Sequence, residues 1–150
     1  TETVINMVSR FSTDRRADVL EAVRRVVADI LLGNGDNHLK NWSFHFPAPG
    51  EVRLSPAYDI VPTVLFIPRD TMALRFVRTH QFETVDIHRF ERVASFLKVD
   101  PKWITREVKV IIERALDLWP KAAPELLGER WAKTLLARLD TLRLVQEVRG

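Results

Sequence analysis

Apolar residues between Asp18 and Leu32 recur at spacings of three and four, which predicts a helix with one buried face. Thr13 or Asp14 is expected to cap its start, because a short polar side chain can accept a hydrogen bond from the first turn. Gly33 is expected to end it, since glycine readily adopts the left-handed conformation found after helices. The stripe consists of Val19, Leu20, Val23, Val26, Val27, Ile30 and Leu31.

A polar loop over residues 33–41 follows the predicted helix and is rich in turn-forming residues. Residues 42–46 then alternate between aromatic and polar side chains, and residues 51–55 alternate again, as strands do. The four residues between them, Pro47 to Gly50, form a turn signal. The pattern predicts a β-hairpin with a four-residue connection.

The segment from Pro56 to Arg69 contains three prolines, which excludes one continuous helix or a central strand. We expect an ordered, irregular segment whose apolar run, Val64 to Ile67, packs under the helices. If this run were exposed, it would instead be a surface for a substrate or partner. Thr71 to Phe76 is expected to be a short strand or an extended piece.

From Val85 onward the pattern is helical again. Asp86 and Asp100 are expected to cap the first two helices, with Pro101 at the first helical position of the second. Pro120 is expected to stop that second helix. The three predicted helices cover residues 86–96, 101–118 and 129–148, with Pro124 and Gly128 bounding the link before the last one. The predicted fold class is therefore mostly α with a small β-hairpin, or α+β overall.

Composition excludes several classes of protein. The chain has 150 residues, of which 46% are hydrophobic, enough for the core of one domain. A disulfide scaffold and a cysteine-based zinc site are excluded because there is no cysteine. No apolar run approaches the ~20 residues of a membrane helix, so we expect no membrane partner. The net charge of +3 comes from basic residues that alternate with acids, which does not favour nucleic acid as a direct ligand.

The candidate chemistry lies between Asn34 and Asp59. Asp36 and Asn41 have the spacing D-x-x-x-x-N, which is the spacing of the protein-kinase catalytic loop. Phosphoryl transfer needs a carboxylate for the attacking hydroxyl and oxygen ligands for Mg²⁺. Asp59, just after the hairpin, is positioned to be the second metal ligand, and Lys40 lies between the two as a candidate phosphate contact.

Two linked motifs resemble the HipA family of bacterial serine/threonine kinases. Residues 33–43 read GNGDNHLKNWS, and residues 54–60 read LSPAYDI after the hairpin. The resemblance implies a protein-kinase-like C-lobe in which Asp36 is the catalytic aspartate. It also implies that Asn41 and Asp59 bind Mg²⁺ and thereby ATP, and that His38 and Lys40 occupy the family's loop positions. Asp59 is followed by Ile-Val and not by the Phe-Gly of other kinases.

The same resemblance implies partners. Members of this family are toxins of toxin–antitoxin modules that phosphorylate a protein, an aminoacyl-tRNA synthetase in the best-known members. A DNA-binding antitoxin of the HipB type neutralises them, so DNA is contacted only indirectly through that antitoxin. A cytoplasmic location follows from these partners and is consistent with the lack of cysteine.

One part of a kinase is missing from the sequence. There is no glycine-rich phosphate loop, and the only G-x-G, Gly33 to Gly35, lies in the catalytic loop. The residues before Asp14 are too few for a five-stranded N-lobe. With Thr1 in first position, we expect residues 1–150 to be the C-terminal lobe of a longer two-lobed kinase and to be inactive alone.

Structural interpretations exist for each candidate. Asp36 beside a glycine is also typical of an Asx turn, Asn41 of a hairpin cap, and Asp59 of a plain structural acid. His38 is expected to act as a hydrogen-bond partner that ties the loop to the helices, in preference to direct catalysis. Lys40 is either solvated or a phosphate contact. The rival hypothesis for the whole chain is a non-catalytic helical interaction module that binds an antitoxin protein or DNA.

Overall fold

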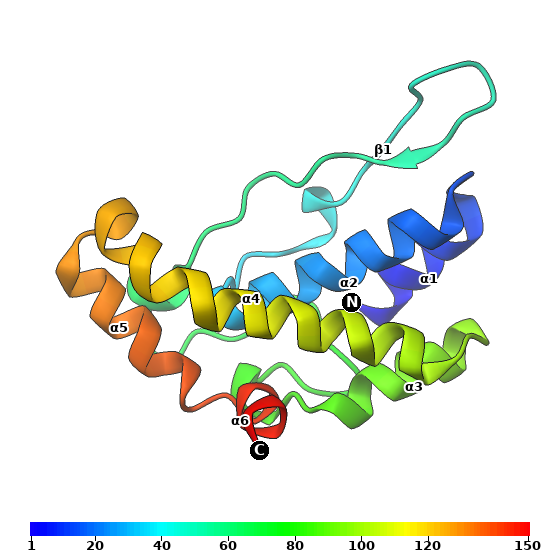
Figure 1. The fold of residues 1–150 in the computed structure, drawn as a ribbon. Helices are drawn as coiled ribbons and strands as arrows, with labels where there is room; N and C mark the ends of the chain where they lie inside the picture. Colours follow the sequence, from blue (N-terminus) through cyan, green and yellow to red (C-terminus); the bar gives the residue numbers. More distant parts are fainter.

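The computed structural model describes residues 1–150, and it is mostly helical with one small antiparallel sheet (Figure 1). The long helix α4 crosses in front of α2, and it packs against α2, α3 and α5. The predicted fold class is confirmed. The elements are α1 (Glu2–Phe11), α2 (Arg15–Leu32), β1 (Phe44–His45), β2 (Arg53–Leu54), α3 (Ile87–Leu97), α4 (Pro101–Leu127), α5 (Glu129–Leu139) and α6 (Arg143–Arg149).

Helix α2 carries the predicted buried stripe and the predicted caps. Asp14 accepts a hydrogen bond from the Ala17 N–H at 3.1 Å, and Gly33 ends the helix with φ 73°. Helix α1 lies outside the elements predicted from the pattern. It packs on α2 through Val4, Ile5 and Val8, whose spacing places them on one helical face.

The hairpin is present, but its strands are shorter than predicted. Phe44 pairs with Leu54 and His45 with Arg53, and the connection between the strands is longer than four residues. The hairpin extends away from the helices (Figure 1). Its base is fixed to the start of α2, because the Thr13 N–H donates to the Val52 carbonyl at 2.8 Å.

Helix α4 corrects the prediction that Pro120 stops it, because it continues through Pro120 and Pro124 to Leu127. Each proline removes one i→i−4 hydrogen bond. Packing of this part of α4 against α5 offsets the loss, and Ala123 is buried there. The link predicted between Pro124 and Gly128 is therefore helical except for Gly128 itself.

The predicted final helix over residues 129–148 is two helices, α5 and α6, with a turn between Leu139 and Arg143. Leu142, Leu144 and Val145 are all fully buried. One straight helix would point Leu142 and Leu144 in nearly opposite directions, so burying all three side chains requires the break.

The segment between β2 and α3 is irregular, as predicted, apart from two short 3₁₀ turns over Thr63–Leu65 and Phe82–Thr84. The expected packing of the run Val64 to Ile67 is only half right. Leu65 is buried, whereas Phe66 and Ile67 are exposed, with Phe66 resting on Trp131 of α5. Thr71 to Phe76 forms no strand, and Phe76 makes one isolated bridge to Thr79.

No helix in the structure combines the length and the apolar character that crossing a bilayer requires.

Candidate functional site

The site is built where α2 ends. The Gly33 N–H donates to the Asp29 carbonyl at 2.8 Å and turns the chain out of the helix. Arg138 of α5 donates from Nη1 to the carbonyls of Ile30 and Leu31, both at 2.8 Å, and so satisfies the last turn. Burial lowers the pKa of Arg138 to about 10. The loop therefore begins at a helix end whose last carbonyl groups are bound by a side chain of α5.

The loop brings Asp36 and Asn41 together. The Asp36 carbonyl accepts from the His38 N–H at 2.8 Å and from Asn41 Nδ2 at 2.9 Å. A single 3₁₀ turn over Leu39–Asn41 closes the distance between them. The Asp36 side chain is 65% exposed, and its carboxylate lies 4.0 Å from His38 Nε2. The D-x-x-x-x-N spacing thus produces one compact turn with the carboxylate in solvent.

The orientation of Asn41 follows from that hydrogen bond. Because Nδ2 is used on the Asp36 carbonyl, the amide oxygen Oδ1 is the remaining ligand atom of this nearly buried side chain. No hydrogen bond to Oδ1 occurs in the structure, so this oxygen remains available as a ligand atom. Asn41 therefore presents an oxygen beside Asp36, as a metal ligand would.

The segment that contains Asp59 lies against this loop. Tyr58 Oη donates to the Lys40 carbonyl at 2.8 Å, with Ser43 Oγ also within 3.2 Å. A small cleft is lined on one side by Asn41 and its neighbours and on the other by Ala57, Tyr58 and Ile60. Asp59 has φ 56°, which is uncommon for a residue with a side chain, and its carboxyl group is exposed.

His38 and Lys40 play lesser parts in this geometry. The predicted side-chain tie of His38 to the helices is wrong, because Nδ1 is buried without a hydrogen-bond partner. Its backbone makes hydrogen bonds within the loop instead, through its N–H to the Asp36 carbonyl and its carbonyl to the Asn41 N–H. The Lys40 side chain is exposed and makes no ion pair in the structure.

The available ligand atoms fit Mg²⁺. Asn41 and Asp59 offer an amide oxygen and a carboxylate, and Mg²⁺ prefers oxygen ligands and takes few of them from protein when phosphates supply the rest. The structure has no group of three or more His, Asp or Glu side chains that would hold a metal by themselves. The donor set thus suits a metal that arrives with a phosphate ligand.

The loop is anchored by residues that the sequence patterns did not single out. The buried Asp29 carboxylate accepts hydrogen bonds from Nδ2 of Asn34, at 2.8 Å, and from Nδ2 of Asn37. Burial raises the pKa of Asp29 to about 6, although these two hydrogen bonds and the charge of Arg25 limit the rise. An acid at a buried position of the α2 stripe is the signal that would have found it.

A second anchor comes from the segment after Asp59. The Gly35 N–H donates to Thr63 Oγ1 at 2.7 Å, and the Thr63 hydroxyl also contacts the carboxylate of Asp70. The Ala73 N–H donates to the Gly35 carbonyl at 2.9 Å. A Cβ on Gly35 would lie 2.0 Å from Asp70 Oδ2, so a larger residue would have to displace this carboxylate from its contact with Thr63.

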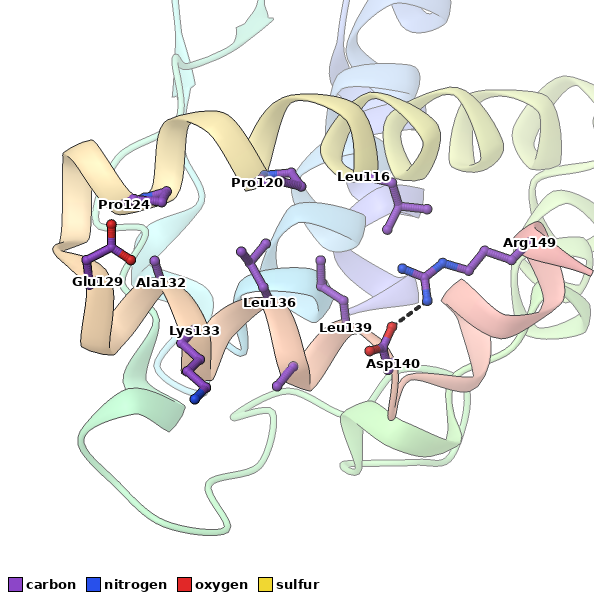
Figure 2. A pocket seen from close by; sticks show the side chains of 11 residues that line it. Leu116, Pro120, Pro124, Glu129, Ala132, Lys133, Leu136, Leu139, Asp140 and Arg149 are labelled. Atoms are coloured by element: carbon purple, nitrogen blue, oxygen red, sulfur yellow. Dashed lines mark hydrogen bonds and ion pairs between the residues drawn. The ribbon is translucent and has the colours of Figure 1, made fainter.

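A separate groove lies between α4, α5 and α6 (Figure 2). Its walls include Leu116, Pro120 and Leu136, and an ion pair between Asp140 and Arg149 lies at one end. None of the predicted site residues lines it. The predicted site at the loop and this groove are therefore distinct parts of the molecule.

Known proteins similar to this chain have kinase names. A protein of Sinorhizobium fredii, "Putative kinase Y4dM", is 34% identical over 133 residues, which is 87% of this chain and 32% of that protein. A "Putative kinase" of Haemophilus influenzae is 35% identical over 60 residues, or 40% of this chain and 18% of that protein. The chain thus spans about a third of the first relative's length and less of the second's.

A solved structure shares the fold. It is the Shewanella oneidensis MR-1 toxin–antitoxin complex of HipA, HipB and operator DNA, matched with a TM-score of 0.76 over 99% of this chain and 37% of that chain. The sequence identity is 18%, so this likeness concerns the fold alone. The family model of the HipA-like C-terminal domain matches residues 1–119. The chain therefore belongs to the HipA family, through that C-terminal domain.

Proposed function

We propose that this chain is the catalytic C-lobe of an ATP-dependent serine/threonine protein kinase of the toxin–antitoxin kind, which acts as part of a longer protein. One observation carries the proposal. Asn41 is hydrogen-bonded to the Asp36 carbonyl in a single turn that leaves the Asp36 carboxylate in solvent, and Tyr58 holds the Asp59 segment against that turn. The kinase names of the relatives support it.

Each residue has a role in the proposed reaction. Asp36 orients the hydroxyl of a protein serine or threonine and takes its proton as that oxygen bonds to the γ-phosphorus and the bond to ADP breaks. Asn41 Oδ1 and the Asp59 carboxylate would hold Mg²⁺, which would neutralise phosphate charge when ATP is bound. Lys40, exposed beside Asp36, is placed for a phosphate or the substrate.

The test uses the protein expressed from its full reading frame. It is incubated with Mg²⁺, γ-labelled ATP and a panel of purified aminoacyl-tRNA synthetases, and label transfer to protein is counted. Asp36→Asn should lower transfer by about 10²- to 10⁴-fold, because it removes the proton acceptor. Asp59→Asn should weaken Mg²⁺-dependent ATP binding, measured by calorimetry.

His88→Ala is the control, because His88 is exposed on α3 and its side chain hydrogen-bonds only to Glu91. It should retain wild-type transfer. If Asp36→Asn and Asp59→Asn both keep wild-type turnover, the assignment is wrong. A 150-residue chain that transfers phosphate by itself would contradict the proposed need for the longer protein.

We also propose a HipB-type antitoxin as partner, with DNA reached only through it. Support comes from the solved relative, which is a complex of HipA, HipB and operator DNA. The rival interaction module would also bind an antitoxin, so binding of Mg²⁺–ATP is the measurement that separates it from the kinase. A full-length protein that binds a HipB-type protein in gel filtration but never binds Mg²⁺–ATP would favour the module.

A further inference from the structure

The Asp29 carboxylate lies directly behind the loop that carries Asp36. It is 5% exposed and sits one turn before the end of α2. Its oxygen Oδ1 accepts from Asn34 Nδ2 at 2.8 Å, and Oδ2 accepts from Asn37 Nδ2. Asn34 and Asn37 lie on either side of Asp36 in the sequence. A single carboxylate on a rigid helix therefore holds both flanks of Asp36.

The connection reaches the backbone of Asp36 itself. Asn34 uses its amide nitrogen on Asp29 and its amide oxygen on the Asp36 N–H, at 3.2 Å. Asn34 is 1% exposed, so neither contact is replaced by water when it is lost. The two hydrogen bonds form a short path from α2 to Asp36.

We propose that Asp29 is a positioning residue that sets the place of Asp36 for phosphoryl transfer, acting through Asn34. The inference rests on the proposed function, since the loop is catalytic only if that function holds. The need for two hydrogen-bond acceptors explains why position 29 holds an acid. A carboxylate accepts at both oxygens, and two amide N–H₂ groups face it. An apolar residue at this position would leave two amide donors unpaired.

The hydrogen bonds also predict which substitution is tolerated. The Asn34 amide cannot rotate, because its oxygen must face the Asp36 N–H. Asn37 makes no other side-chain hydrogen bond and is free to reverse its amide. In Asp29→Asn the new amide would therefore accept from Asn34 and donate to a reversed Asn37. In Asp29→Ala both contacts are lost.

Two measurements on the full-length protein test the inference. Hydrogen exchange, followed by mass spectrometry on peptides covering residues 33–41, should be about tenfold faster in Asp29→Ala and restored in Asp29→Asn. In the transfer assay, Asp29→Ala should lower kcat about ten- to a hundredfold, while the KM for ATP changes less than about twofold. Asp29→Asn should recover most of kcat, and Asn34→Ala should act more strongly than Asn37→Ala.

His88→Ala serves again as the control, because His88 is exposed on α3 and its side chain hydrogen-bonds only to Glu91. It should leave exchange at residues 33–41 and kcat unchanged. The inference is overturned if Asp29→Ala exchanges like the wild type, or if Asp29→Asn is as impaired as Asp29→Ala. A wild-type protein without phosphoryl transfer would instead overturn the proposed function. The exchange measurement would still show whether Asp29 orders the loop over residues 33–41.

Discussion

Asp18 and Asp29 lie about three turns apart on the same face of α2, and both side chains are buried. Asp18 accepts from the Arg53 guanidinium at 2.9 Å, from Ser12 Oγ at 2.6 Å and from the Leu54 N–H at 2.8 Å. Asp29 accepts only from two neutral amides. One helix thus has a charge-paired acid at its start and an acid without a bonded cation at its end.

The pKa values follow from these partners. Burial alone would raise the pKa of Asp18, but the hydrogen bonds from Arg53, Ser12 and Leu54 outweigh it, so its pKa lies below the ordinary value. Burial raises the pKa of Asp29 to about 6, because neutral amides and the charge of Arg25 offset only part of the desolvation. Asp18 therefore fixes the hairpin to α2 with a stabilising charge, whereas Asp29 orders the loop at some expense of stability.

The largest expected effect tests the packing at the loop end of α2. Gly35→Ala should lower the free energy of unfolding by about 3 kcal/mol, because the new Cβ would overlap the Asp70 carboxylate, which Thr63 and the Thr71 N–H hold in place. Urea unfolding measures it.

Gly50→Ala is the matched control at the hairpin turn. Unlike Gly35, Gly50 has a positive φ, of 79°, and no atom lies within 4 Å of its added Cβ. Only backbone strain of about 1–2 kcal/mol is then expected. Equal losses in the two variants would show that the loop is not packed closely against the segment after Asp59.

The second prediction contrasts the two acids directly. Asp18→Ala should lower the free energy of unfolding at pH 7 by about 2 kcal/mol, because it leaves a buried N–H and a guanidinium without their partner. Asp29→Ala should cost about 1 kcal/mol, since removing an unfavourable buried charge offsets the lost hydrogen bonds. Urea unfolding of both variants shows which one loses more stability. A larger loss in Asp29→Ala than in Asp18→Ala would contradict the comparison of the two acids.

The third prediction concerns pH. Folding raises the Asp29 pKa from 3.8 to about 6, so the folded state binds more protons between these values and the protein loses stability as pH rises through them. Asp29→Asn removes this loss. The variant should be more stable than the wild type by on the order of 1–3 kcal/mol at pH 8, and the difference should vanish below pH 4.

Asp18 should show the opposite sign. Its pKa is lowered on folding, so its contribution is present above about pH 4 and is lost as pH falls below the ordinary carboxyl value. Thermal unfolding of Asp18→Asn and Asp29→Asn from pH 3 to pH 8 compares them. Among charged side chains near Asp29, Arg25 opposes the rise in pKa. Parallel pH curves for the two variants would sink the prediction.

The features that could be predicted from the sequence are local ones. The α2 stripe, its caps at Asp14 and Gly33, and the turn that joins Asp36 to Asn41 all depend on residues within a few positions of one another. The roles of Asp36, Asn41 and Asp59 stay predictions, although the structure places their segments side by side.

The features that could not be predicted depend on distant contacts. The Thr63 hydroxyl on the Gly35 N–H is a pairing that no spacing rule specifies. Proline propensity favoured a helix end at Pro120, but tertiary packing against α5 keeps the helix intact. Asp29 lies among the buried residues of α2, and the spacing of apolar residues does not indicate the two amides that bond to it.

The smallest predicted effect separates capping from charge pairing at the start of α2. Asp14 accepts from the Ala17 N–H, and its carboxylate is 3.9 Å from Arg53, which bonds closely to Asp18 instead. Asp14→Ala should therefore lower the free energy of unfolding by about 1 kcal/mol, the value of an N-cap, and Asp14→Ser should keep most of it although it removes the charge. If Asp14→Ser lost as much stability as Asp14→Ala, the charge of Asp14 and not its capping hydrogen bond would stabilise the start of α2. The hairpin would then depend on the charges of both Asp14 and Asp18, whereas the hydrogen bonds indicate Asp18 alone.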